Sequence, residues 1–274
     1  MYTLIDSIND LSILNEELLT KACIGIDTEF RRTNKFNMKL ALLQVNDDEE
    51  IYLIDTMIIE DLNEQASFLK SDKVIKVLHS CKEDIEAIFT WTGEQICNVF
   101  DTQIANSFLG YEHSISYQNL VKEKFDVSLE KKETRSNWIR RPLTESQLKY
   151  ATLDVEYLIR IYEIQLDLLN RQNKLSWHNE EIKKLIKETL NPIEHIAYPR
   201  FLSKSQEEEL LKNFNRIVHE IAVKENINET LLFSKKSQKD FVRLLYNVGE
   251  DKAFATITLW RKNLIQEKLV EIII

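Results

Sequence analysis

Three β-rich segments follow one another early in the chain, before the pattern turns to alternating strands and helices. CIGIDTEF, MKLALLQV and EIYLID begin at residues 23, 38 and 50, and the turn-forming residues 46–49 join the last two. A shorter β segment lies near Tyr2–Ile5, and VIKVLH and NVFDT begin at residues 74 and 98 with a helical pattern between them. This order predicts an α/β protein with a mixed sheet covered by helices.

The second half of the 274-residue chain is helical in pattern almost to its end. From about Thr144 the apolar spacing predicts one long helical stretch that passes through Ile164. Pro192, Pro199 and polar residues interrupt the pattern near residues 192–205. We therefore expect two domains: residues 1–198 hold the sheet and a helical extension, and residues 199–274 form a smaller all-α domain.

Composition excludes several classes of protein. The four glycines form neither a GxGxxG motif nor a P-loop, which argues against nucleotide cradles of those kinds. A formal net charge of −9 argues against a large nonspecific nucleic-acid surface but leaves room for a local basic track. No apolar run approaches the roughly 18 residues of a membrane span, and the acidic N-terminus does not resemble a signal peptide. The three cysteines lack metal-type spacing, so we expect a cytoplasmic protein with reduced thiols.

Two acids stand at the end of the first apolar strand, in the sequence IGIDTEF. Because side chains alternate along a strand, Asp27 and Glu29 point to one face. At a separation of about 4 Å and an effective dielectric near 20, their repulsion costs on the order of 4 kcal/mol. Either the strand emerges into solvent there, or a divalent cation converts the repulsion into attraction. Hard oxygen ligands suit Mg²⁺ or Mn²⁺.

The segment VLHSCKEDIEAI places a third acid just past a predicted strand. Ser80 and Glu83 have the spacing of a capping box, which predicts a helix that begins at Cys81. Asp84 then lies in the first helical turn, where acids commonly interact with the helix dipole. His79, at the end of the strand, is interpreted as a structural histidine. Asp84 alone therefore indicates either a dipole partner or a further ligand.

A tyrosine and an aspartate lie one helical turn apart in the stretch YATLDVEYL. Tyr150 and Asp154 share a face of the predicted helix because residues four apart are neighbours on its surface. Such pairs commonly form a polar edge beside a core face. The pair by itself does not distinguish that structural role from a catalytic one.

Taken in order, these motifs resemble the tyrosine-bearing branch of the DEDD exonuclease superfamily. DTEFRRTNKFNMKLALLQV, IYLIDT, FDTQIANSFLG and KKETRSNWIRRPLTESQLKYATLDVEYL resemble ribonuclease D more specifically. The resemblance extends from about Thr3 to Leu169. It implies a ribonuclease-H-like fold and a metal-dependent 3′-5′ exoribonuclease that releases nucleoside 5′-monophosphates.

The resemblance also implies roles for individual residues. The four acids of the motifs would hold two divalent ions, Mg²⁺ or Mn²⁺: Asp27, Glu29, Asp84 and Asp154. Tyr150 would hold or deprotonate the attacking water. The implied substrates are single-stranded RNA 3′ ends, tRNA precursors among them, and we expect a monomer without membrane contact. A DNA exonuclease of the same superfamily and an inactive nucleic-acid-binding adaptor are the alternatives, although an adaptor would be expected to lack one or more of the acids.

A basic segment supplies candidate RNA contacts. Lysines and arginines surround one tryptophan, with Glu133 the only acid between residues 131 and 141. Phosphate neutralisation and base stacking are what a single-strand groove requires, although a solvated loop anchored by a core tryptophan has the same composition. The candidate RNA-binding residues are Arg31, Arg32, Lys132, Arg135, Trp138, Arg140 and Arg141. The segment 199–274 weakly resembles a degenerate helicase-and-RNase-D C-terminal domain.

Overall fold

A computed structural model describes residues 2–34, 37–59, 62, 64–130, 133–192 and 202–273. The chain forms two compact units. The first unit comprises Met1–Gln103, Ile115–Asp167 and Leu185–Asn191, and the second comprises Ile104–Ser114, Leu168–Lys184 and Pro192–Ile274. The domain boundary predicted between residues 198 and 199 lies outside the described residues, so that division of the chain stays a prediction.

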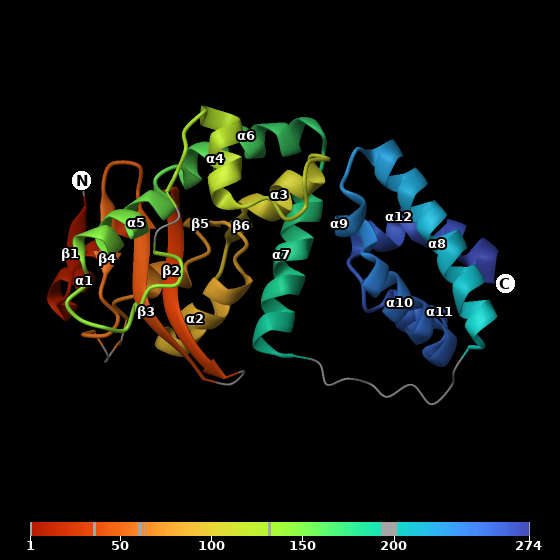
Figure 1. Cartoon of the computed structure of the whole chain (residues 1–274), viewed down its shortest axis with the longest axis horizontal. Coiled ribbons are helices and arrows are strands. Elements are labelled where there is room, and N and C mark those ends of the chain that lie inside the picture. The colour runs from red at the N-terminus through yellow and green to blue at the C-terminus, as the bar shows by residue number, and fades with distance from the viewer. Residues whose placement is uncertain are drawn as a thin grey trace. The chain divides into compact units, whose positions relative to one another are not determined.

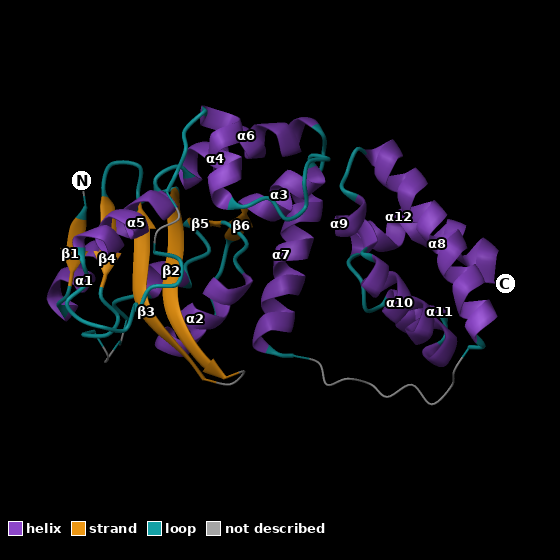
Figure 2. Cartoon of the chain, viewed as in Figure 1, coloured by secondary structure: helices purple, strands orange, loops and turns teal. Residues whose placement is uncertain are grey.

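A six-stranded mixed sheet organises the first unit (Figure 2). Its strands are β1 (Thr3–Ile5), β2 (Cys23–Asn34), β3 (Asn37–Asn46), β4 (Ile51–Ile54), β5 (Ile75–Leu78) and β6 (Val99–Asp101). They lie in the order β1-β4-β3-β2-β5-β6. β2, β3 and β4 are antiparallel neighbours, whereas β1 runs parallel to β4 and β5 runs parallel to both β2 and β6. The mixed sheet predicted from the order of β-rich segments is therefore confirmed.

Helices follow the strands along the chain (Figure 1). Up to residue 192 they are α1 (Ile8–Leu18), the 3-10 helix η1 (Ser67–Leu69), α2 (Lys82–Thr92), α3 (Thr102–Phe108), α4 (Tyr117–Phe125), α5 (Glu145–Val155), α6 (Leu158–Arg171) and α7 (Leu175–Leu190). Beyond residue 201 they are α8 (Lys204–Glu225), α9 (Glu229–Phe233), α10 (Lys235–Val248), α11 (Glu250–Phe254) and α12 (Leu259–Ile273). Within the described ranges, every helix falls short of the length or the apolar character that a membrane crossing needs.

The two faces of β2 meet different helices. α5 contacts β2, β3 and β4, while α2 contacts β2 and β3. A Cβ atom on Gly25 would lie 3.1 Å from the Leu158 Cβ and 3.4 Å from the Val155 carbonyl oxygen. The alternate residue Thr28 instead donates a hydrogen bond to Asp84 on α2. Strand alternation therefore directs Gly25, Asp27 and Glu29 toward α5, and it directs Thr28 toward α2.

The predicted long helix after Thr144 is divided into α5 and α6. Asn46 Nδ2 donates to the carbonyl oxygens of Val155 at 3.0 Å and Glu156 at 3.3 Å. The Tyr157 amide donates to the Tyr117 hydroxyl at 3.0 Å. Because these side chains take up backbone groups that would otherwise continue the helix, the chain breaks at residues 156–157, and the prediction of a single helix is wrong.

The start of α2 also differs from the prediction. Ser80 has a φ of +62°, and α2 begins at Lys82 with Cys81 as its N-cap. Within the described residues, that cap contributes no side-chain hydrogen bond. The Cys81 amide donates instead to Asp101 Oδ2 at 2.7 Å, an acid at the end of β6. The predicted capping box is therefore wrong, because a serine that caps a helix typically has an extended backbone, whereas Ser80 has a left-handed one and Cys81 takes the N-cap position. Asp84 nevertheless lies in the first turn, as predicted.

An aromatic cluster forms part of the second unit's core. The rings of Trp177 and Trp260 stack with centroids 5.4 Å apart, and Phe108 lies edge-on to Trp260 at 5.1 Å. Glu181 accepts hydrogen bonds from the Trp260 indole nitrogen and from Arg261. Segments on both sides of residue 192 thus build a single core in this unit.

Candidate active site

Three carboxylates meet at the face of β2 that is covered by α5. Asp27, Glu29 and Asp154 each place a carboxylate oxygen within 4.8 Å of the others. Strand alternation brings Asp27 and Glu29 to one face. A capping box between Thr144 and Gln147 begins α5 one residue after Thr144, so Asp154 lies in the last turn of that helix. A segment more than a hundred residues away along the chain thereby completes the cluster.

Ionising the three carboxyl groups of this cluster is unfavourable, as their raised pKa values show. Burial, with repulsion from Asp154 and Asp84, raises the pKa of Glu29 to about 9. Burial likewise raises the pKa of Asp154 to about 7, against a lowering by the hydrogen bond from Tyr150. The pKa of Asp27 lies well above its usual range because of burial and repulsion from Asp84, Asp154 and Glu29. In the metal-free protein the three carboxyl groups therefore favour their protonated, uncharged forms more than ordinary carboxyl groups do.

Asp84 lies beside the three-carboxylate group. Its Oδ1 accepts a hydrogen bond from the Thr28 hydroxyl, and Thr28 is the residue between Asp27 and Glu29. Burial raises the pKa of Asp84 to about 7, although the Thr28 hydrogen bond lowers it. Repulsion from Asp84 in turn raises the pKa of Asp27. The structure thus couples Asp84 to the cluster electrostatically, while its carboxylate is held from the α2 side of the strand.

Tyr150 projects from α5 one turn before Asp154. Its hydroxyl lies 3.2 Å from the Thr134 hydroxyl, and its ring packs against Trp138 with centroids 6.1 Å apart. Burial and the charges of Asp154 and Glu29 raise the pKa of Tyr150 above its usual range. In the field of the protein's own groups the phenol therefore stays protonated and can donate a hydrogen bond.

A cavity of about 150 Å³ opens at this cluster. Its lining consists of Asp27, His79, Tyr117, Gln118, Tyr150, Asp154 and Leu158. His79 is held by the Thr102 hydroxyl at 2.8 Å and the Ile115 carbonyl at 3.0 Å, one contact at each ring nitrogen. Both nitrogens of His79 are thus engaged, which agrees with the structural role predicted for it.

The donor set suits a divalent cation. Carboxylate oxygens are the ligands that Mg²⁺ and Mn²⁺ prefer. Three such groups converge here; burial raises the pKa of each, and repulsion from neighbouring acids adds to the rise for Asp27 and Glu29. A cation would convert that repulsion into attraction. The residues present therefore fit the metal site that the sequence motifs suggested.

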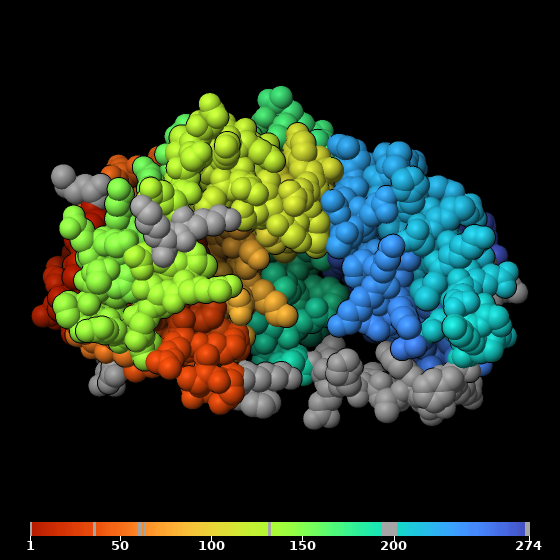
Figure 3. Space-filling view, viewed as in Figure 1, coloured from red at the N-terminus to blue at the C-terminus, as the bar shows by residue number. Residues whose placement is uncertain are grey.

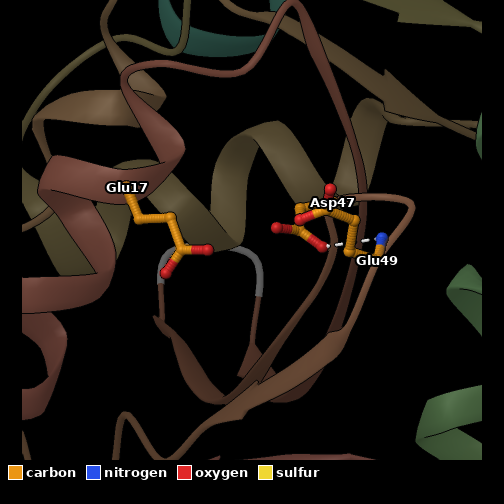
Figure 4. Close-up of side chains that lie close together, drawn as sticks. All are labelled: Glu17, Asp47 and Glu49. Carbon is orange, nitrogen blue, oxygen red and sulfur yellow. Dashed lines mark hydrogen bonds between the residues drawn. The ribbon is translucent and has the colours of Figure 1, made fainter.

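A second acidic group, Glu17, Asp47 and Glu49, has comparable spacing but a different charge balance (Figure 4). Asp47 Oδ1 accepts the Glu49 backbone amide at 3.0 Å. Lys21 Nζ lies 2.8 Å from Asp47 and 2.9 Å from Glu49. These two hydrogen-bonded acids raise the pKa of Lys21 above its usual range. Since a lysine already supplies the positive charge, this group is explained as an ion-pair network.

Arg141 is engaged in contacts within the protein. Its guanidinium forms a two-point ion pair with Asp55 and also donates to the carbonyl oxygens of Trp138 and Ala41. A further bond reaches its neighbour Arg140. Because these bonds occupy its donors, Arg141 acts as a structural clamp in this structure, and its contact with RNA stays a prediction.

Trp138 and Arg32 are likewise engaged within the protein. The Trp138 side chain is only 3% exposed, and its ring packs against Tyr150. Arg32 forms two hydrogen bonds of 2.8 Å with Glu86. Trp138 thus packs in the core and Arg32 forms an ion pair, and the RNA contacts of both residues stay predictions.

Three arginines of the predicted RNA-binding set are exposed: Arg31, Arg135 and Arg140. Lys132 lies outside the described residues. Figure 3 shows the segment after residue 132, in light green, at the surface of the first unit. These exposed arginines keep the RNA-binding role as a prediction.

Two supporting residues were missed from the sequence. Thr28 holds Asp84, and Thr134 lies against the Tyr150 hydroxyl. Thr28 carried a recoverable signal, because its position between two acids directs it to the opposite face of the strand. Thr134 carried none, because it comes from a loop without periodic pattern.

Comparisons with known proteins give a consistent picture. A family model described as 3′-5′ exonuclease matches residues 2–169. The chain is 41% identical over 170 residues to the Ribonuclease D of Pseudomonas paraeruginosa, covering 62% of this chain and 45% of that protein. It is 37% identical over 183 residues to the Ribonuclease D of Desulfotalea psychrophila, covering 66% and 49%. The chain thus spans about half the length of these curated relatives.

Solved structures share the fold. The crystal structure of Escherichia coli RNase D, described as an exoribonuclease involved in structured RNA processing, aligns with a TM-score of 0.65 at 22% identity, covering 100% of this chain and 74% of that one. Brucella melitensis NrnC with bound Mg²⁺ aligns with a TM-score of 0.60 at 21% identity, covering 73% and 98%. The predicted ribonuclease-H-like fold with a helical C-terminal region is confirmed.

Proposed function

The chain belongs to the 3′-5′ exonuclease family, and we propose that it is a metal-dependent exoribonuclease acting on RNA 3′ ends. The observation that carries this proposal is the convergence of Asp27, Glu29 and Asp154 at a cavity that Tyr150 lines together with the two aspartates. Retention of the whole acidic set, Asp84 included, favours an enzyme over an inactive adaptor.

RNA is preferred over DNA as the proposed substrate. The support comes from the Ribonuclease D relatives, which are 33–41% identical to this chain over 145–187 residues. The DNA exonuclease of the same superfamily remains the second candidate, because hydrolysis at a two-metal carboxylate site acts on the phosphodiester, which RNA and DNA share. We extend the proposal to tRNA precursors as natural substrates, to a monomer, and to the cytoplasm, where the free thiols of all three cysteines would persist.

Each residue of the site has a part in the proposed reaction. Asp27, Glu29 and Asp154 would hold two divalent ions, Mg²⁺ or Mn²⁺, with Asp84 completing the set. When bound, such a pair of ions supplies positive charge to the attacking and leaving oxygens of an in-line displacement. Tyr150, fixed by Thr134 and adjacent to Asp154, would orient the attacking water. Hydrolysis at the terminal phosphodiester would release a nucleoside 5′-monophosphate.

The exposed arginines would guide the substrate. Arg31, Arg135 and Arg140 can each neutralise a phosphate, and charge of this kind supplies most of the sequence-independent affinity for a single strand. Such contacts are consistent with a protein of net charge −9, because they form a local track. We propose that the second unit adds to the grip on longer or structured RNA, as a degenerate helicase-and-RNase-D C-terminal domain would.

An assay on labelled oligonucleotides tests the proposal. RNA and DNA of one sequence, labelled at the 5′ end, are incubated with Mg²⁺, with Mn²⁺ or with chelator. A matched RNA whose 3′ end is blocked by a phosphate serves as the substrate control, and Asp27→Asn serves as the protein control. We expect stepwise shortening of the free-ended RNA, nucleoside 5′-monophosphate as product, and loss of activity with chelator or Asp27→Asn. Equal cleavage of the DNA would favour the second candidate, and metal-independent or internal cleavage would contradict the proposal.

A further inference from the structure

Gln44 on β3 is a fully buried amide whose hydrogen-bonding groups are not used. Its side chain is 0% exposed. Neither its Nε2 nor its Oε1 has a hydrogen-bond partner among the residues that the structure describes. The other buried side chains with an unpartnered polar atom in this part of the chain each leave one atom unmatched. Leaving a buried polar group without a partner costs about 1–3 kcal/mol, so this arrangement needs a reason.

The position of Gln44 in the sheet supplies that reason. Gln44 is the direct cross-strand partner of Asp27 in the antiparallel pairing of β3 with β2. Directly paired residues share a face, with Cβ atoms about 4.5–5.5 Å apart. The register shifts in this pairing occur later, between Glu29 and Phe30 and between Arg32 and Asn34, so they do not disturb the pair.

A neighbouring pair shows which face this is. Asn46 pairs with Gly25, and Asn46 Nδ2 donates to the Val155 carbonyl at the end of α5. Gln44 lies two residues from Asn46, as Asp27 lies two residues from Gly25, so all four share the α5 side of the sheet. The Gln44 amide is therefore on the same face as the carboxylate cluster, beneath the helix that carries Asp154.

We propose that Gln44 is a positioning residue for the metal site, and that its amide Nε2 donates a hydrogen bond to the Asp27 carboxylate when the site holds its cations. This inference rests on the proposed metal-dependent function. A carboxylate that binds a cation through one oxygen keeps acceptor capacity on its remaining lone pairs. A donor fixed in the neighbouring strand would hold that carboxylate in its binding orientation, as partners of metal ligands commonly do.

The test compares two matched glutamine substitutions. Gln44→Met keeps the volume of the side chain and removes its donor. Gln165→Met is the control, because Gln165 is equally buried and belongs to the same unit but donates to the Thr102 carbonyl. The affinity for Mn²⁺ is measured by electron paramagnetic resonance, and the melting temperature is measured in chelator, for the full chain and both variants.

We expect Gln44→Met to weaken Mn²⁺ binding by about 10–100-fold, the range for losing a partner of a metal ligand. Its melting temperature in chelator should equal or exceed that of the wild type, because the substitution breaks no hydrogen bond of the metal-free protein. Gln165→Met should show the opposite pattern, with a lower melting temperature and an unchanged Mn²⁺ affinity. An unchanged Mn²⁺ affinity in Gln44→Met would overturn the proposal, as would a loss of stability without a loss of affinity.

A measurement on the wild type covers the case in which Gln44→Met does not fold. The side-chain amide signals of Gln44 and Gln165 are followed by nuclear magnetic resonance during a Mg²⁺ titration. The Gln44 signal should move with saturation while the Gln165 signal stays in place, and a stationary Gln44 signal overturns the proposal. Failure of the wild type to bind either metal would overturn the proposed function as well. If the wild type binds metal but its Gln44 amide signal does not move, only this inference is overturned.

Discussion

Arg141 Nε lies 2.5 Å from Asp55 Oδ2, and its Nη2 lies 2.7 Å from Asp55 Oδ1. The Asp55 side chain is buried, and the pair joins the end of β4 to the segment that precedes α5. That segment carries Trp138, against which Tyr150 packs. The ion pair therefore holds in place the segment whose Trp138 packs against Tyr150.

We expect Arg141→Ala to destabilise the protein by about 3 kcal/mol, because it leaves the buried Asp55 carboxylate without its positively charged partner. Denaturant unfolding followed by circular dichroism measures the change. Arg140→Ala is the matched control, and its exposed neighbouring side chain should alter stability by about 0.5 kcal/mol or less. Equal stability of the two variants would contradict the clamp assigned to Arg141.

Arg140 and Arg135 are predicted to contact RNA through phosphates. Replacing either residue with Ala should weaken RNA binding and reduce the log–log salt slope by about 0.7 for a single strand. The measurement is fluorescence anisotropy with a labelled oligonucleotide across a series of salt concentrations, in chelator to prevent cleavage. Lys204→Ala, at an exposed residue of the second unit, is the control for a general effect of net charge. A salt slope that is unchanged in all three variants would show that Arg135 and Arg140 make no phosphate contact and are exposed to solvent only.

Tyr150→Phe should lower kcat by about 10²–10⁴, the range for a lost proton-transfer or water-orienting group. The ring and its packing on Trp138 remain, so stability and Mn²⁺ affinity should stay close to those of the wild type. Thr134→Val tests the support of the Tyr150 hydroxyl separately from the hydroxyl itself. It removes the Thr134 hydroxyl, which lies against Tyr150, and leaves the phenol in place. Single-turnover cleavage at saturating metal checks both variants, and a wild-type rate for Tyr150→Phe would return the tyrosine to a packing role.

The metal-free protein should lose stability as the pH rises, through its carboxylate cluster. The pKa of Asp154 is raised to about 7 and that of Glu29 to about 9, so the folded state binds these protons more tightly than the unfolded state. Their contribution is complete below the ordinary carboxyl pKa, near 4, and it is lost as the pH rises through about 7 to 9.

Asp154→Asn should remove part of this dependence. In chelator, the melting temperature of the variant relative to the wild type should rise by several degrees between about pH 5 and pH 8, since about 1 kcal/mol corresponds to about 2–4 °C for a protein of this size. Mg²⁺ should reverse the order by stabilising the wild type alone. Thermal melts across this pH range measure both effects, and a difference that is independent of pH and metal would contradict the electrostatic account of the cluster.

The sequence by itself determined the residues that local periodicity places. A strand repeats every two residues, so Asp27 and Glu29 had to share a face, and a helix brings residues four apart together, so Tyr150 had to lie beside Asp154. The order of β-rich segments likewise predicted a mixed sheet. These rules depend only on neighbours along the chain, which is why the mixed sheet and the two local pairs could be predicted. The metal-binding role of the acids and the ribonuclease-H-like fold were implied by the resemblance to ribonuclease D.

Only the tertiary structure decided which charged and aromatic side chains were already engaged. Arg141 and Trp138 have the composition of an RNA-binding segment, but Asp55, 86 residues away from Arg141, takes the guanidinium and the core takes the indole. Asn46 similarly ends α5, from 109 residues away. A side chain's partner depends on which distant segments the fold brings within about 3 Å, and the spacing of residues along the chain carries no information on that distance.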